Sequence, residues 1–142
     1  MTKNQISSNE FPSPNGSYPN ARKVGNLLFL SSVGPRRPGT NVIPGVMMDG
    51  QGNEIGHDIE VQCHSAFENV RAILEEEGSR WENLIDITVF LTNMRRDFDT
   101  YNAICANYFQ KNQPCRTTVE VTSLPTPIAI ELKCIATCNI GI

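Results

Sequence analysis

An arginine opens one of the last predicted strands of this chain. Residues 114–121 read "PCRTTVEV", and the β-branched residues that follow Arg116 favour an extended backbone. A guanidinium beside half-buried residues needs an anionic partner or open solvent. Its planar fork also suits a carboxylate, which it can bind with two hydrogen bonds. Arg116 is therefore either an ordinary charge at a strand end or the anchor of a carboxylate ligand, and both interpretations stand at this point.

A glutamate in the final predicted strand is the second candidate. The strand spans about 128–138, Glu131 lies within it, and apolar residues occur on both of its faces. If strands 116–122 and 128–138 pair as a hairpin through "SLPTP", Arg116 faces Glu131. That pair would set a carboxylate clamp beside a base able to activate water. The alternative is a solvated glutamate, or a partner for Lys133 across an oligomer.

Other polar residues could join this pair, although each alone is more often structural. The two adjacent arginines of the glycine-rich loop, Arg36 and Arg37, form either a solvated turn or a site for a second anionic group. Tyr18 could cover an apolar pocket. The further candidates are Ser31, Ser32, Asn102 and Thr118.

The elements that must position these residues follow from hydrophobic periodicity. A hairpin turning at Gly25-Asn26 is followed by a long loop with one short strand near 42–48. Asp58 is a plausible N-cap of an amphipathic helix that ends at Gly78. The later elements are the strand "LIDITVFL", with Ile85, Ile87, Val89 and Leu91 on one face, a helix over about 97–112, and the strands 116–122 and 128–138.

This order predicts a single α+β domain over residues 1–142, with residues 1–15 as a loose arm and two layers of structure. Both helices are expected on one face of the sheet. The other face then has no helix, although the last strand alternates apolar residues on both of its sides. An uncovered and partly apolar sheet face predicts burial against further copies of the chain.

Composition narrows the function classes. A net charge of −3 disfavours nucleic-acid binding, and no apolar run approaches the roughly 18 residues of a membrane span. The first residues show no secretory signal, so a cytoplasmic location is expected. Five cysteines without a Cys-x-x-Cys, and only two histidines, predict reduced thiols and no metal site.

Several segments resemble the RidA/YjgF family of imine deaminases. The most specific is "PCRTTVEVTSLPTPIAIELKCIA", and "VFLTNMRRDFDTYNAICANYF" and "VQCHSAFENVRAILEEEGS" are similar to the family's middle segments. The resemblance implies a chorismate-mutase-like fold with a mixed sheet and a homotrimer with clefts between subunits. No cofactor is expected, because an imine carbon is already electrophilic. The resemblance also implies roles for six residues. Arg116 would bind the substrate carboxylate and Glu131 would lie near the attacking water, with Tyr18, Ser32, Asn102 and Thr118 around them.

The loop after the hairpin departs from the usual family pattern, with "SSVGPRRPG" in place of a Ser-Gly-Gln motif. In its overall sequence the chain is similar to the 2-aminomuconate deaminases of this superfamily. This resemblance implies hydrolysis of the enamine dicarboxylate 2-aminomuconate to 4-oxalocrotonate and ammonia. Arg36 or Arg37 would then meet the distal carboxylate. The alternatives are a generic 2-imino acid deaminase and a trimer that binds small ligands without catalysis.

Overall fold

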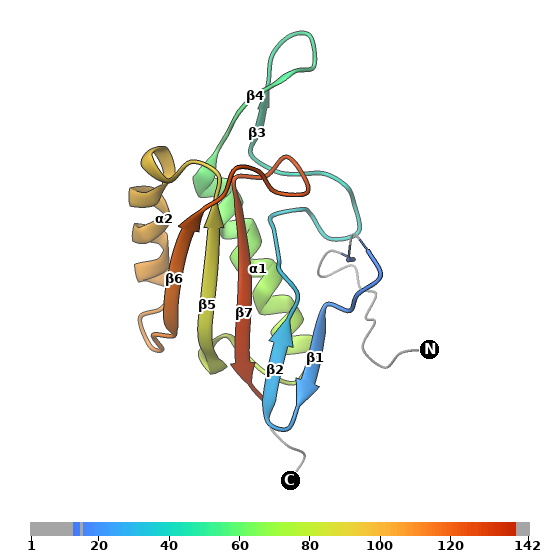
Figure 1. Cartoon of the computed structure of the whole chain (residues 1–142), viewed down its shortest axis with the longest axis vertical. Helices are drawn as coiled ribbons and strands as arrows, with labels where there is room; N and C mark the ends of the chain where they lie inside the picture. The colour runs from blue at the N-terminus through green and yellow to red at the C-terminus, as the bar shows by residue number, and fades with distance from the viewer. Residues whose placement is uncertain (1–12, 15, 139–142) are drawn as a thin grey trace.

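The computed structural model describes residues 13–14 and 16–138, which form two helices and two sheets (Figure 1). The predicted loose arm, residues 1–15, lies outside the described residues except for Ser13 and Pro14. The elements in chain order are β1 (Ala21–Val24), β2 (Leu27–Leu30), β3 (Val46–Met48), β4 (Glu54–His57), α1 (Ile59–Glu76), a 3-10 turn (Trp81–Asn83), β5 (Leu84–Leu91), α2 (Met94–Tyr108), β6 (Cys115–Glu120) and β7 (Ile130–Thr137).

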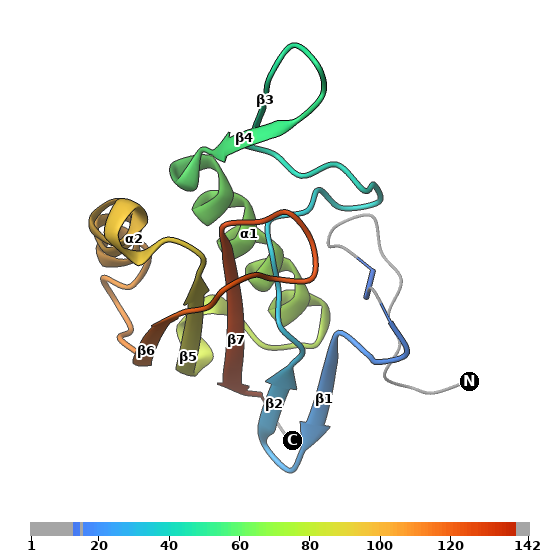
Figure 2. The same cartoon turned by 45° about the horizontal axis from the view of Figure 1, so that its top comes forward.

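The main sheet has five strands in the order β1-β2-β7-β5-β6. β5 and β6 run parallel, and the other neighbours run antiparallel, so the sheet is mixed. Both helices lie on one face of this sheet, as Figures 1 and 2 show from two directions. The predicted α+β fold with two layers is confirmed.

The predicted hairpin between the last two strands is wrong. β5 lies between β6 and β7, so Arg116 is opposite Ile87 of β5 and Glu131 is opposite Phe90. The physical reason lies in β5 itself. Its residues Ile87, Val89 and Leu91 are buried, and its backbone N–H and C=O groups are fully hydrogen-bonded only when a strand lies on each side. The segment 121–129 is long enough to cross one strand, and sequence alone gave no sign that it does so.

Local signals located most helix ends. The Asp58 side chain accepts a hydrogen bond from the Val61 amide and caps α1, as predicted, and Gly78 follows the helix with φ 80°. The second helix begins earlier than predicted, because the Asn93 side chain caps it by accepting from the Arg96 amide.

Two strand assignments also needed correction. The long loop forms a small hairpin of β3 and β4 that projects from the body in Figure 2, whereas only one short strand was predicted there. Ile85 is exposed rather than on the buried face of β5, because the pairing register shifts between Leu84 and Asp86.

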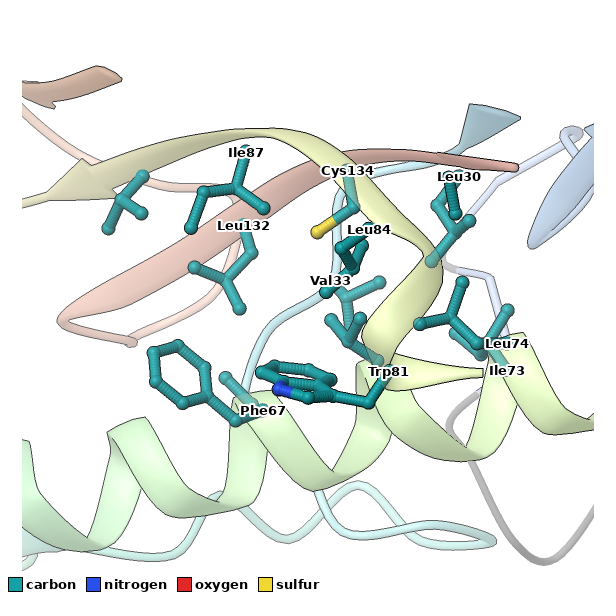
Figure 3. Close-up of a cluster of buried hydrophobic side chains, with 14 of the residues drawn as sticks. Leu30, Val33, Phe67, Ile73, Leu74, Trp81, Leu84, Ile87, Leu132 and Cys134 are labelled. Carbon is teal, nitrogen blue, oxygen red and sulfur yellow. The ribbon is translucent and has the colours of Figure 1, made fainter. Parts of the chain in front are cut away.

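The core lies between α1 and the sheet. Figure 3 shows Phe67 and Trp81 under Leu132 and Cys134, with their ring centroids 5.9 Å apart. Four cysteines are buried as free thiols and Cys115 is exposed. This packing fixes the spacing between α1 and the strand that bears Glu131.

The opposite sheet face has no helix and keeps a partly apolar surface. Phe29 and Ile135 pair across β2 and β7, while Phe90 and Val119 pair across β5 and β6, all on this side. None of these four is buried in the single chain. Its burial in a homotrimer stays a prediction.

Candidate active site

The two main candidates lie on opposite faces of the sheet. Arg116 pairs with the buried Ile87 and so shares the face that the helices cover. Glu131 lies between the buried Ile130 and Leu132, so its side chain leaves β7 on the other face. Three residues along the strands and two strand spacings separate their Cα atoms by roughly 14 Å. The two side chains therefore belong to two separate pockets.

Arg116 is held by the second helix in what we call the arginine pocket, which is lined by Ile87, Asn102, Cys105, Phe109 and Arg116, among others. Its Nη2 donates a hydrogen bond of 2.8 Å to Asn102 Oδ1. The guanidinium lies 5.4 Å from the centre of the Tyr101 ring, within cation–π distance. Tyr101, Asn102 and Cys105 lie on about one turn of α2, so a single helix face positions the arginine.

The groups that hold Arg116 are neutral. Burial raises the pKa of the Cys105 thiol, although its hydrogen bond with Arg116 opposes this, and burial also raises the pKa of Tyr101. No ion pair formed among residues 13–14 and 16–138 includes Arg116. The guanidinium is thus oriented by its neighbours while its charge is not neutralised by a carboxylate of the described chain.

Thr118 contributes indirectly to the position of Arg116. Its hydroxyl lies 2.8 Å from the Tyr101 hydroxyl, and Tyr101 is completely buried. The hydrogen bond fixes the ring on which the guanidinium stacks. Within the single chain, Thr118 therefore reaches Arg116 through Tyr101.

Glu131 lies in a second pocket, the glutamate pocket, which is lined by Tyr18, Ser32, Gly34, Arg36 and Glu131, among others. Partial burial raises the pKa of Glu131 above the ordinary carboxyl range, and a hydrogen bond from the Ser32 hydroxyl offsets part of this. A carboxylate with a raised pKa can both accept and return a proton nearer to neutral pH.

The backbone sets Ser32 beside Glu131. Val33 and Leu132 exchange two hydrogen bonds, of 2.8 and 2.9 Å, which extend the sheet beyond β2. The backbone of Gly34 then lies close to Ile128 and Glu131. A Cβ at this position would lie 3.0 Å from Ile128 Cδ1 and 3.7 Å from Glu131 Oε2. A side chain at position 34 would fill the space in front of the carboxylate.

The structure separates the two loop arginines. Arg36 lines the glutamate pocket, where it donates to the Ser13 carbonyl and, at 3.4 Å, to Asn41 Oδ1. Arg37 is exposed and lines a different groove beside His64 and Glu68.

Two of the remaining candidates make structural contacts. Ser31 donates its hydroxyl to the Pro19 carbonyl at 2.7 Å. Lys133 donates to the Leu30 carbonyl at 2.5 Å within the chain, so its predicted pairing with Glu131 across an oligomer stays a prediction.

The structure thus gathers Tyr18, Ser32, Arg36 and Glu131 in one pocket and Asn102 with Arg116 in the other. Sequence reasoning missed the residues that hold these groups, Tyr101, Cys105, Gly34 and Asn69. Asn69 offered a signal, because it is an amide between Phe67 and Val70 on the apolar stripe of α1. Gly34 offered none, since its role depends on contacts between distant segments.

Across the described part of the chain, no three His, Cys, Asp or Glu side chains gather where they could hold a metal ion. Of the two helices described, neither combines the length and the apolar character needed to cross a bilayer.

Comparison with known proteins supports the family resemblance. The model of the family described as "Endoribonuclease L-PSP" matches residues 8–138. A RutC family protein of Pyrococcus abyssi is 35% identical over 136 residues, which cover 96% of this chain and 98% of that protein. The Arabidopsis thaliana protein named "Reactive Intermediate Deaminase A, chloroplastic" is 33% identical over 137 residues, covering 96% of this chain and 67% of that protein.

Solved structures agree with the sequence comparison. The crystal structure of E. coli TdcF with bound serine is 29% identical, has a TM-score of 0.81, and covers 96% of this chain and 100% of that one. A putative endoribonuclease of Thermotoga maritima is 30% identical with a TM-score of 0.80, covering 97% of this chain and 99% of that one. On the extent of these matches, the chain belongs to the Endoribonuclease L-PSP family, the superfamily of the RidA/YjgF proteins.

Proposed function

We propose that this protein hydrolyses the imine and enamine forms of 2-amino acids to 2-oxo acids and ammonia, at a site formed between two copies of the chain. The observation that carries the proposal is the guanidinium of Arg116, which is oriented by Asn102 and Tyr101 without a carboxylate partner in the described chain. A fixed and unpaired guanidinium is the group that a substrate carboxylate needs.

The site requires a second copy because Arg116 and Glu131 lie on opposite sheet faces. One small substrate cannot contact both groups of a single chain at the separation given above. β6 is an edge strand of the sheet, so the arginine pocket lies at the margin of the chain. A cyclic assembly that sets this margin against the glutamate pocket of the next copy would bring the two groups together.

The chemistry follows from the two groups. Arg116 binds the carboxylate next to the C=N bond with two hydrogen bonds and so fixes C2 of the imine. Glu131 takes a proton from a water molecule as its oxygen bonds to C2 and passes this proton to the imine nitrogen, which gives a neutral carbinolamine. The hydroxyl proton of the carbinolamine then passes to the amino nitrogen, the C–N bond breaks, and ammonia leaves as the carbonyl forms. No net oxidation occurs, because the oxygen of water stays on C2 and both of its hydrogens leave with the nitrogen.

The names of related proteins support this class of reaction. One relative is named a reactive intermediate deaminase, and one neighbour in structure holds serine, a small amino acid with a carboxylate. The family description instead names an endoribonuclease. A net charge of −3 does not favour binding to a phosphate backbone, so we propose the deaminase and not RNA cleavage. A cytoplasmic location stays a prediction.

We further propose 2-aminomuconate as the substrate, which the relatives named above do not specify. The support is the sequence resemblance and the position of Arg36 in the glutamate pocket. An imine tautomer bound through its C1 carboxylate would direct its distal carboxylate away from Arg116. Arg36 could exchange the neutral Ser13 carbonyl for that carboxylate, a stronger hydrogen-bond partner for a cation.

Replacing the clamp tests the proposed function directly. We expect Arg116→Ala to lower kcat/KM by about a hundredfold or more, because the imine carbon is no longer held in line with the water. Arg116→Lys should be intermediate, since an ammonium cannot bind the carboxylate in the same bidentate way. Ammonia release from 2-iminobutanoate and from 2-aminomuconate measures both. Arg37→Ala is the matched control, and near-normal turnover by Arg116→Ala would reject the clamp.

Glu131→Gln should lower kcat by roughly 10²–10⁴-fold with little change in KM, because the amide cannot accept the proton. In the wild type, activity should be lost as the pH falls through a pKa higher than that of an ordinary carboxyl group. Ser32→Ala removes a hydrogen bond that lowers this pKa, so the acid limb should move to higher pH. An acid limb that stays in place in Glu131→Gln would assign the titration to another group.

The choice of substrate depends on Arg36. Arg36→Gln should reduce kcat/KM for 2-aminomuconate by about tenfold to a hundredfold, the loss of one hydrogen bond to a charged group. The value for 2-iminobutanoate, which has no distal carboxylate, should hardly change. Arg37→Gln is the control, because it removes the same positive charge from the neighbouring position of the loop. If Arg36→Gln affects both substrates equally, Arg36 does not read the second carboxylate.

A further inference from the structure

Two amides are buried on the face of α1 that packs against the sheet. Gln62 is completely buried and Asn69 is 4% exposed. They lie seven residues apart, about two helical turns, and so share one side of the helix. A buried amide is costly unless its hydrogen bonds are made, so the partners of these two side chains show what they hold in place.

Asn69 holds the loop that forms one wall of the glutamate pocket. Its Nδ2 donates one hydrogen to the Gly34 carbonyl and the other to the Arg36 carbonyl, each at 2.9 Å. The intervening Pro35 is buried and has no amide hydrogen to donate. A single side chain therefore fixes both ends of this three-residue segment.

This segment faces Glu131 directly. The backbone at Gly34 lies so near that an added Cβ would come within 3.7 Å of Glu131 Oε2, and the Arg36 side chain lines the same pocket. A small shift at Gly34 changes the space in front of the carboxylate. A small rotation at Arg36 changes where its guanidinium points.

Gln62 holds the opposite wall. Its Oε1 accepts from the Ala129 amide at 2.8 Å, two residues before Glu131, and its Nε2 donates to the Pro44 carbonyl at 3.1 Å. One helix face thus fixes both the strand that bears Glu131 and the loop in front of it. α1 therefore holds the backbone on two sides of the pocket through side-chain hydrogen bonds.

We propose that Asn69 is a positioning residue for the glutamate pocket and acts through the backbone of Gly34 and Arg36. The inference concerns a role in the arrangement of Glu131 and Arg36, and its catalytic consequence rests on the proposed function. A purely structural amide would affect folding alone. A positioning amide also affects the environment of Glu131 and the recognition of the distal substrate carboxylate by Arg36.

The test compares Asn69→Ala with Ser79→Ala. Ser79 is also buried and donates at 2.7 Å to the Thr137 carbonyl, at the other end of β7, so its loss weakens the fold without touching the pocket. The pKa of Glu131 is measured by NMR titration of its ¹³C-labelled carboxyl group, assigned with Glu131→Gln. We expect Asn69→Ala to lower this pKa toward the ordinary carboxyl value, because water enters when the wall at Gly34 is released, and Ser79→Ala to leave it unchanged.

Activity gives the second measurement. Asn69→Ala should reduce kcat/KM for 2-aminomuconate at least several-fold more than for 2-iminobutanoate, and its effect should not add to that of Arg36→Gln. Asn69→Ser, which keeps one hydroxyl donor and adds no charge, serves if the alanine variant is too unstable. An unchanged Glu131 pKa in a folded Asn69 variant would overturn the inference. A wild type that releases no ammonia would contradict the proposed function alone, since the NMR titration needs no activity.

Discussion

The position of β5 between β6 and β7 is the constraint on which the rest of the structure depends. β5 carries the buried Ile87, Val89 and Leu91 and pairs its backbone with a strand on each side, and the two strands are those that bear Arg116 and Glu131. Strand alternation then directs the two side chains to opposite faces. A hairpin would have let them neutralise each other as an internal ion pair. The observed order leaves the guanidinium at one margin of the chain and the carboxylate in another pocket, and for this reason the proposed function assigns a chemical role to a second copy.

The local surroundings set the orientation of Arg116 and the pKa of Glu131. Asn102, Cys105 and the Tyr101 ring orient Arg116, while partial burial keeps the pKa of Glu131 raised. Groups that orient a charge without cancelling it preserve its affinity for a ligand. The buried amides of α1 extend the same arrangement to the backbone, because the walls of the glutamate pocket are tied to a helix and not only to neighbouring loops.

Sequence reasoning predicted what local chemistry determines. The cap at Asp58, the hairpin at Gly25-Asn26 and the alternation of β7 lie in short stretches of residues, and the structure confirms them. The pairing of β6 failed because nothing within it distinguishes β5 from β7 as a neighbour. The predicted clamp and base were each found in a pocket, but not in the same one. Their supports at Tyr101, Gly34 and Asn69 depend on contacts between distant segments, which periodicity cannot reveal.

The central claim is that one copy supplies Arg116 and the next copy supplies Glu131. The direct measurement is complementation between Arg116→Ala and Glu131→Gln, two variants that should each retain only about 1% of the wild-type activity or less. Both are mixed, dissociated and reassembled, and native mass spectrometry verifies that mixed oligomers form. In randomly mixed trimers, about a quarter of the sites would combine an intact Arg116 with an intact Glu131, so ammonia release should return to about a quarter of the wild-type rate. Verified mixed oligomers with no more activity than the separate variants would contradict the account.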